Sequence, residues 1–205
     1  KYKKSYDDKL IDYNKLLAAK KAIATIDKPP QEPMTEFKLL IVGNHGCGKD
    51  VAAMAIAEAI GLTYTGSLSS SAWLQTFYKI LDRVGVNVPC TLGEFIQLRH
   101  NYSGYLTAMF TELRRIDPLE LLRQHKGQIV TGVRSVAELN WFLDNDVPIL
   151  HIDRDGCPDD PTIEYCLSSL GCSTTHYTYI RNAKSLDKFI LDVSNIALNN
   201  KEVWS

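Results

Sequence analysis

The residues best suited to chemistry form a glycine loop, Gly43-Asn44-His45-Gly46-Cys47-Gly48-Lys49-Asp50. Its G-x-x-x-x-G-K spacing is typical of loops that bind nucleotide phosphates, because glycines let the backbone approach a ligand closely. Backbone N–H groups at the start of a helix form an anion site there, and the Lys49 ammonium would reach the β- and γ-phosphates. The loop therefore predicts nucleotide binding.

Asp50 stands where such loops usually carry Ser or Thr. The hydroxyl of a Ser or Thr would ligate Mg²⁺, and a carboxylate offers the same ion a hard oxygen. We therefore expect ATP and Mg²⁺ as cofactors, with Asp50 as the metal ligand. The residues predicted to contact the nucleotide are Gly43, Asn44, His45, Gly46, Cys47, Gly48, Lys49, Asp50 and Val51.

A serine cluster follows the second predicted strand, residues 62–64. Ligands of open α/β sheets bind beyond the carboxyl ends of the strands, so Ser69, Ser70 and the nearby Trp73 are candidates for a sugar phosphate and a stacked base. A helix N-cap with a core aromatic explains the same residues equally well. Arg99, at the end of a predicted helix, could bind an acceptor phosphate through two hydrogen bonds.

Arg134 follows the apolar strand 128–132 and is expected to bridge donor and acceptor phosphates. Glu138, four residues later, could pair with Arg134 across one helical turn and is, with it, a candidate to contact the substrate. No acidic residue stands at the end of this strand, so Asp153, at the end of the next, is an alternative acid. Its neighbour Arg154 is a candidate lid arginine.

The adjacent arginines 114 and 115 cannot both face one site, because neighbouring residues of a helix point in different directions. We expect each of them to lie on the surface.

The composition is that of an ordinary globular protein, with 45% apolar residues, 23% charged residues and a net charge of −1. No apolar run approaches the roughly 20 residues of a membrane span, and no signal peptide is visible. Five cysteines at irregular spacing favour reduced thiols and a cytoplasmic location. A zinc site at Cys157, Cys166, Cys172 and His176 is disfavoured, because the C-x₂-C spacing is missing.

The periodicity predicts an N-terminal helical arm followed by one α/β domain. Residues 1–33 contain an amphipathic helix and a proline-rich linker, suited to docking or homodimerisation, and residues 34–205 form the domain. Strands are expected at 37–42, 62–64, 128–132, 148–152 and 177–180, and helices at 48–60, 70–84, 92–99, 102–115, 135–145 and 184–199.

Several segments resemble, in order, the bacteriophage deoxynucleoside monophosphate kinase-like proteins. These are GNHGCGKDVAAMAIAEAIGL, GSLSSS, IVTGVRSVAEL, ILHIDRD and YIRNAKSLDKFI. The resemblance implies an adenylate-kinase-like P-loop fold, with a mainly parallel five-stranded sheet flanked by helices. It implies donor and metal roles for Lys49 and Asp50, phosphate contact for Arg134, and a place near the donor base for Asn182. If the chain is phage-encoded, its compartment is the host cytoplasm. Residues 85–125, where the acceptor should bind, match poorly.

Three functions remain open. The first is ATP- and Mg²⁺-dependent phosphoryl transfer to a (deoxy)nucleoside monophosphate, with Lys49, Asp50 and Arg134 as catalytic residues. The second keeps the fold but phosphorylates a hydroxymethylated pyrimidine in phage DNA, because the lysine-rich arm suits a polymeric phosphate substrate. The third is a nucleotide-binding module of a larger assembly, favoured by the missing acid at the end of the 128–132 strand.

Overall fold

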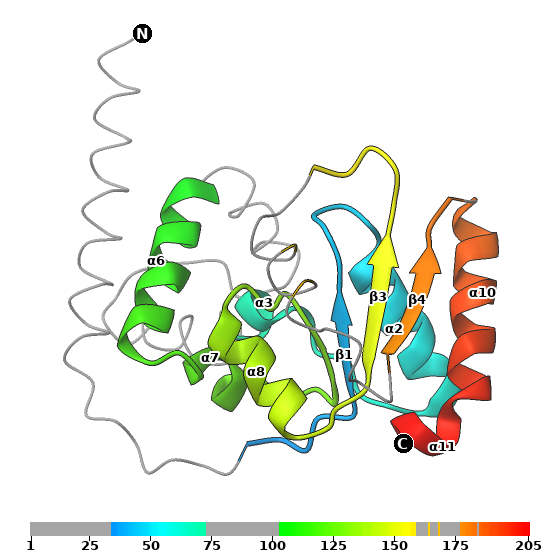
Figure 1. Ribbon diagram of the computed structural model, residues 1–205, viewed down its shortest axis with the longest axis horizontal. Helices are drawn as coiled ribbons and strands as arrows, with labels where there is room; N and C mark the ends of the chain where they lie inside the picture. The colour runs from blue at the N-terminus through cyan, green and yellow to red at the C-terminus, as the bar shows by residue number, and fades with distance from the viewer. Residues whose placement is uncertain (1–33, 73–102, 159–163, 165–167, 169–176, 184) are drawn as a thin grey trace, which may run out of the picture.

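The computed structural model describes residues 34–72, 103–158, 164, 168, 177–183 and 185–205. Four parallel strands form one sheet in the order β2-β1-β3-β4, and helices follow β1, β2 and β4 along the chain (Figure 1). The expected α/β class with a mainly parallel sheet is confirmed. The predicted N-terminal helix and linker lie outside the described residues.

The strands are short apolar runs: β1 is Leu39–Val42, β2 Ile129–Thr131, β3 Ile149–Asp153 and β4 Tyr177–Arg181. Every residue of β1 and β2 is buried, as expected for parallel strands that are covered on both faces. In β4, exposed and half-buried residues alternate, which fits a strand at the edge of the sheet.

The strand expected at residues 62–64 does not form among the described residues, so the sheet they build has four strands. The Thr63 carbonyl accepts the N–H of Gln128 at 2.9 Å, directly before β2. However, the Thr63 N–H donates to the side-chain Oε1 of Gln128 at 3.1 Å. Because a side chain takes the place of the backbone acceptor, the contact does not continue into a ladder.

The helices are α2 Lys49–Ile60, α3 Leu68–Ala72, α6 Ser103–Ile116, α7 Glu120–Gln124, α8 Val136–Asp144, α10 Leu186–Asn199 and α11 Lys201–Trp204. Those expected at 48–60, 102–115, 135–145 and 184–199 are confirmed to within two residues. The helix expected at 70–84 is described only as far as Ala72, and the one at 92–99 lies outside the described residues. No helix in the described part of the chain is long and apolar enough to span a membrane.

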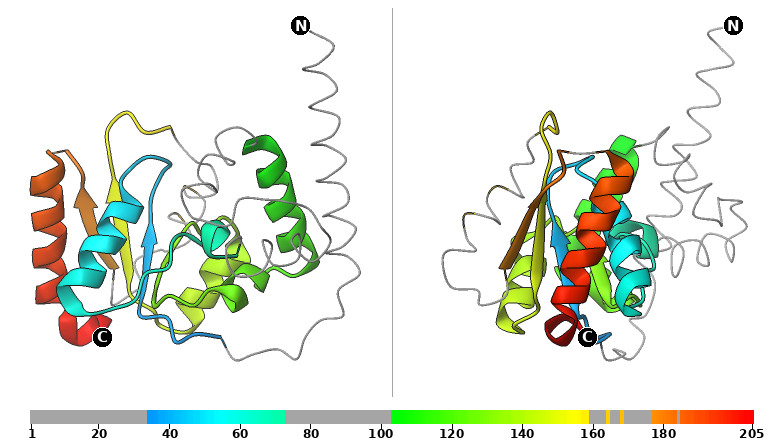
Figure 2. Two further views of the ribbon diagram at one scale, coloured as in Figure 1. Left: turned by 180° about the vertical axis from the view of Figure 1, so that it is seen from behind. Right: turned by 90° about the vertical axis from the view of Figure 1, so that its right-hand side faces the viewer.

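Two hydrophobic cores lie on opposite faces of the sheet (Figure 2). The α2–α10 core contains Leu39, Ile41, Ala52, Ile56, Leu150, Ile152, Phe189, Val193 and Trp204. The α8 core contains Phe37, Leu40, Val42, Leu68, Phe110, Leu121, Leu122, Val130, Leu139 and Phe142. Alternate residues of β1 enter the two cores because successive side chains of a strand point to opposite faces.

Candidate functional site

The glycine loop joins the C-terminal end of β1 to the N-terminus of α2 and packs closely against its neighbours. Gly43 and Gly48 have φ angles of 146° and 103°. A Cβ on Gly43 would lie 2.1 Å from the carbonyl oxygen of Ile152, and one on Gly48 would lie 2.8 Å from Nδ2 of Asn182. Both the backbone conformation and the close approach therefore require glycine at these two positions.

Residues that follow β3 and β4 hold the loop from outside. Asn182 donates from Nδ2 to the carbonyl oxygen of Cys47 at 2.9 Å, and from its N–H to the carbonyl oxygen of Asp153 at 2.7 Å. The resemblance places Asn182 near a donor base, whereas in the structure its amide binds the loop itself. The exposed Arg154 lies beside the loop, with Nη1 3.5 Å from the carbonyl oxygen of Gly46.

Lys49 points back over the loop that precedes it. Its Nζ donates to the carbonyl oxygens of Gly43 at 2.8 Å and Asn44 at 2.6 Å. Burial lowers the pKa of Lys49, and the positive charge of Arg134 lowers it further, while the nearby Cys47 acts in the opposite direction. Arg134 follows β2, the neighbour of β1, so its charge acts on Lys49 from the adjacent strand.

Asp50 lies in the first turn of α2, where its carboxylate is exposed. Oδ1 of Asp50 accepts a hydrogen bond from the hydroxyl of Tyr64 at 2.5 Å and another from Oγ1 of Thr131 at 3.0 Å. The two hydroxyl oxygens are 3.1 Å apart. Burial raises the pKa of Tyr64, and the charge of Asp50 raises it further. The phenol therefore stays protonated and remains a hydrogen-bond donor to the carboxylate.

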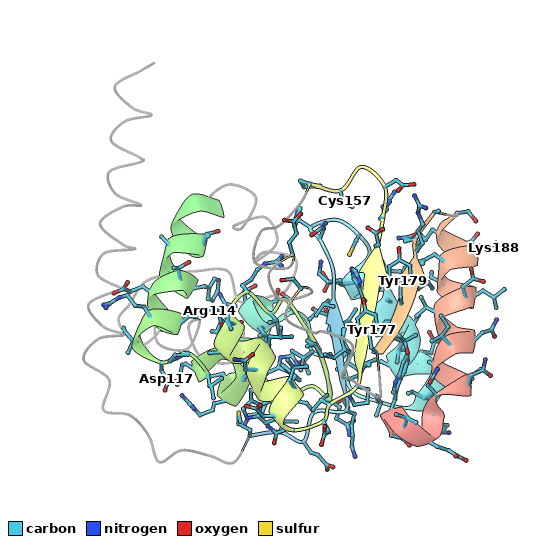
Figure 3. The ribbon with its side chains drawn as sticks, in the orientation of Figure 1. Arg114, Asp117, Cys157, Tyr177, Tyr179 and Lys188 are labelled. Atoms are coloured by element: carbon cyan, nitrogen blue, oxygen red, sulfur yellow. The ribbon has the colours of Figure 1, made fainter. Side chains whose placement is uncertain are left out.

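The turn after β2 is organised around Glu138. Its Oε2 accepts the N–H groups of Arg134 at 2.8 Å and Ser135 at 3.2 Å, and the hydroxyl of Ser135 accepts the N–H of Glu138, which makes a capping box. Its Oε1 accepts Nε of Arg114 at 2.6 Å, so the turn is linked to α6 (Figure 3). Glu138 thereby fixes the backbone that carries Arg134.

Two expectations about this turn are corrected. Glu138 was expected to contact substrate and to pair with the side chain of Arg134, but it is fully buried and binds that residue through the backbone. The predicted surface position is wrong for Arg114, whose side chain is 13% exposed. It is confirmed for Arg115, whose side chain is 72% exposed. The carboxylate is buried because the turn leaves two N–H groups that need an acceptor.

The serine cluster lies beside the turn after β2. A Cβ on Gly132 would lie 3.1 Å from Cβ of Ser67, which precedes α3. Ser70 is buried, and its hydroxyl is 2.9 Å from that of Ser67, while Ser69 is half-buried. Ser70 therefore satisfies a neighbouring hydroxyl rather than facing a ligand. Trp73 and Arg99 lie outside the described residues.

Cysteines contribute a thiol to the loop and another beside it. Cys47 is fully buried, and burial raises the pKa of its thiol, which keeps it protonated. Cys157 is half-buried in the turn after β3 (Figure 3), and both thiols are free. Cys166, Cys172 and His176, the other members of the zinc alternative, lie outside the described residues.

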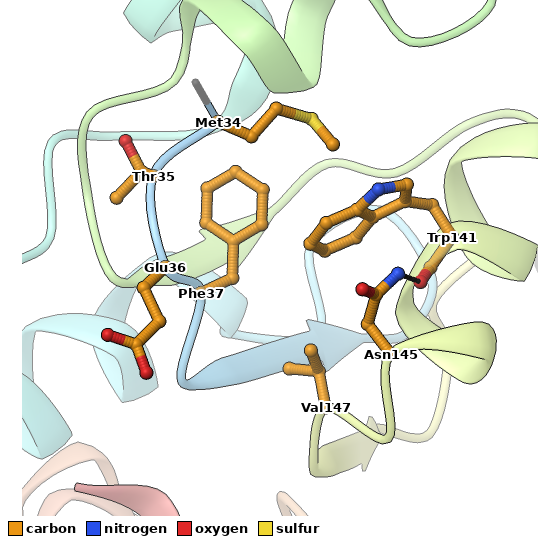
Figure 4. Close-up of a pocket in the computed structure, with 7 residues that line it drawn as sticks. All are labelled: Met34, Thr35, Glu36, Phe37, Trp141, Asn145 and Val147. Atoms are coloured by element: carbon orange, nitrogen blue, oxygen red, sulfur yellow. Dashed lines mark hydrogen bonds between the residues drawn. The ribbon is translucent and has the colours of Figure 1, made fainter.

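A pocket of about 370 Å³ lies at the opposite end of the sheet (Figure 4). It is lined by Met34, Thr35, Glu36, Phe37, Trp141, Asn145 and Val147. Phe37 precedes β1 and Val147 precedes β3, whereas the glycine loop follows the carboxyl end of β1. The pocket is thus separate from the cluster of Lys49, Asp50 and Arg134.

The sequence reasoning missed Tyr64 and Thr131. Tyr64 was placed in a strand, and Thr131 was passed over because an acid was sought at the end of that strand. Thr131 lies close to the loop because β2 runs beside β1 with Thr131 opposite Ile41, a pairing that the structure shows and the sequence does not. The contact of Tyr64 with Asp50 has no sequence signal either.

A comparison with models of known protein families finds no match to this chain, and a comparison with curated protein sequences finds none either. Function must therefore be inferred from the geometry of the site. That geometry combines a glycine loop at the start of a 12-residue helix, the cations Lys49 and Arg134, and the exposed carboxylate of Asp50.

Proposed function

We propose that the chain is a P-loop phosphotransferase that moves the γ-phosphoryl group of ATP to a (deoxy)nucleoside monophosphate, giving ADP and a nucleoside diphosphate. The observation that carries this proposal is the glycine loop that opens α2, with Lys49 folded over it and Asp50 hydrogen-bonded to Thr131 at the end of β2, three residues before Arg134. Phosphoryl transfer needs positioning and charge neutralisation rather than covalent chemistry, and this set of groups supplies both.

The donor phosphates would bind at the glycine loop, where backbone N–H groups and the start of α2 favour an anion. Lys49 now donates to two carbonyl oxygens of its own loop. On nucleotide binding its ammonium would exchange these neutral acceptors for phosphate oxygens. Such an exchange is favourable because hydrogen bonds between charged partners are stronger than those to carbonyls.

A magnesium ion bound with the nucleotide fits the oxygen that the chain offers. No group of three His, Cys, Asp or Glu side chains in the described part of the chain is arranged to hold a metal alone. Mg²⁺ at nucleotide sites typically takes one or two protein oxygens and completes its shell with phosphates and water, so a single exposed carboxylate at Asp50 is sufficient. When bound, the ion would neutralise charge on the phosphates.

Arg134 would act between the two substrates. Its backbone is fixed by Glu138, so the side chain extends from a defined position just beyond the carboxyl end of β2. There it would contact the transferred phosphoryl group and stabilise the charge that develops during in-line transfer. The acceptor would approach from the side of Ser67 and Gly132, which are in contact beside this turn.

The test is ADP release from ATP and Mg²⁺ with single deoxynucleoside monophosphates, followed by mass-spectrometric analysis of the products. We expect one or more monophosphates to become diphosphates. Lys49→Ala should lower turnover by about a hundredfold or more, because it removes a charge that stabilises the transition state. Lys38→Ala is the matched control, since this lysine pairs with Glu36 at 2.9 Å and precedes β1 at the far end of the sheet.

Two other results would favour one of the alternative functions instead. Turnover stimulated only by duplex DNA with hydroxymethylated pyrimidines would assign the acceptor to DNA. ATP binding without turnover on any acceptor would favour a nucleotide-binding module. The module has a specific observation in its favour, because the end of β2 carries Thr131 where an acidic residue would be expected of an enzyme of this kind.

A further inference from the structure

The carboxylate of Asp50 is held by one oxygen only. Oδ1 accepts both hydroxyl groups, from Tyr64 and Thr131, and within the described residues Oδ2 accepts no hydrogen bond. Tyr64 is half-buried and Thr131 is fully buried, whereas Asp50 itself is exposed. The carboxylate is therefore anchored on the protein side and open on the other.

A carboxylate at this position needs such an anchor more than a hydroxyl does. The side chain of Asp has one more bond to rotate than that of Ser or Thr, and ordering it on a ligand costs rotamer entropy. Two hydrogen bonds to the same oxygen fix the rotation in advance. The phenol of Tyr64 and the hydroxyl of Thr131 are the two donors.

We propose that Tyr64 is a positioning residue that holds Oδ1 of Asp50 and thereby presents Oδ2 as the single protein oxygen for the Mg²⁺ of the nucleotide complex. Thr131 supports the same oxygen from β2. The inference rests on the proposed function, because it requires a nucleotide with its metal at the glycine loop. It assigns to Tyr64 a role that neither its sequence neighbourhood nor its burial would suggest.

The test measures the gain in ATP affinity that Mg²⁺ provides, by titrating a fluorescent ATP analogue into the full chain with EDTA and then with excess Mg²⁺. In Tyr64→Phe we expect this gain to fall by about tenfold, the effect of losing one hydrogen bond to a charged group. The affinity in EDTA should stay within about twofold of the wild type, because the loop that binds the phosphates is unchanged.

Three further variants complete the design. Asp50→Ala should remove most of the gain, and Thr131→Val should reduce it without altering the volume of the buried side chain. Thr131→Val also keeps the inference testable if Tyr64→Phe does not fold. Tyr177→Phe is the control and should leave the gain unchanged, because that hydroxyl, on the edge strand β4, lies 2.7 Å from Nδ1 of His151 on β3.

The outcomes separate this inference from the proposed function. A wild-type chain that binds no ATP in either condition overturns both. If the wild type binds ATP with Mg²⁺ but Tyr64→Phe keeps the full gain, Tyr64 is not a positioning residue and the proposed function stands. If Tyr64→Phe loses as much ATP affinity in EDTA as in Mg²⁺, Tyr64 has a structural role in the loop. If Mg²⁺ raises the ATP affinity of Tyr64→Phe more than that of the wild type, Tyr64 competes with the metal for Asp50. Either result overturns the inference.

Discussion

The two faces of the sheet are stabilised in different ways. The α2–α10 core packs apolar side chains of two long helices against β1, β3 and β4, and Phe189 from this core reaches the glycine loop. The side of the α8 core also contains fully buried polar side chains, among them Glu138 and His125. The difference teaches that apolar packing adds to the hydrogen bonds that hold the glycine loop, whereas the turn that carries Arg134 depends on a buried carboxylate.

The first face needs no buried charged acceptor, because the polar groups of the glycine loop are bonded by Lys49 and Asn182. The carbonyl oxygens of Gly43 and Asn44 accept Lys49, and Asn182 binds that of Cys47. Phe189 then lies against Gly48, where an added Cβ would be 3.2 Å from its Cε1. On the second face the turn leaves backbone N–H groups pointing into the protein, and these require a buried acceptor.

The largest effect is expected from removing that acceptor. Glu138→Ala leaves Arg114 and two backbone N–H groups without their partner, and breaking a buried pair in this way costs about 3–5 kcal/mol of unfolding free energy. Glu112→Ala is the control, because it breaks an exposed pair with Arg115 on α6, worth about 1 kcal/mol or less. Urea denaturation measures both. Equal losses would contradict the contrast drawn between the two faces.

Matched truncations of the two cores should affect stability alike and binding differently. Phe142→Leu and Phe189→Leu each remove part of a fully buried ring and should lower the free energy of unfolding by about 1–3 kcal/mol. Only Phe189→Leu should also weaken ATP binding, since Phe189 packs against the glycine loop. Thermal unfolding and nucleotide titration of both variants test this. Weakened binding in Phe142→Leu would show that the α8 core also supports the loop.

A pH dependence is expected to arise in the polar face, and near neutral pH it is the smallest of these effects. His125 is fully buried, and burial lowers its pKa from 6.5 to about 4, against a hydrogen bond from its ring to the carbonyl oxygen of Ile129. The unfolded chain therefore binds a proton at a higher pH than the folded one, so stability falls as the pH drops from 6.5 toward 4. The slope from this residue is at most about 1.4 kcal/mol per pH unit.

His125→Gln isolates this contribution, because the variant keeps a polar side chain that does not titrate. The difference in unfolding free energy between wild type and variant should be constant near pH 7 and should shift in favour of the variant toward pH 4. Denaturation curves at four or five pH values would measure it. A parallel pH dependence in both proteins would place the origin of any acid instability elsewhere.

Much of the fold could be predicted because its signals are local. The apolar runs that became β1, β2, β3 and β4 and the periodicity of α2 and α10 are features of neighbouring residues. The capping box of Ser135 and Glu138 is also a local pattern, and the S-x-x-E spacing could have shown that the glutamate binds backbone. The prediction of a strand at 62–64 was wrong, because a glutamine side chain takes the place of the backbone acceptor.

In the candidate site, too, the local features could be predicted and the long-range contacts could not. By itself the sequence determined the glycine loop, its lysine and the helix behind it, because such a loop needs only a short run of residues in one conformation. Only the tertiary structure decided that Asp50 meets Tyr64 and Thr131, 14 and 81 residues away, and that Glu138 meets Arg114, 24 residues away. Such partners are chosen by the parallel pairing of strands and by which helices pack on each face, and neither leaves a periodic trace in the chain.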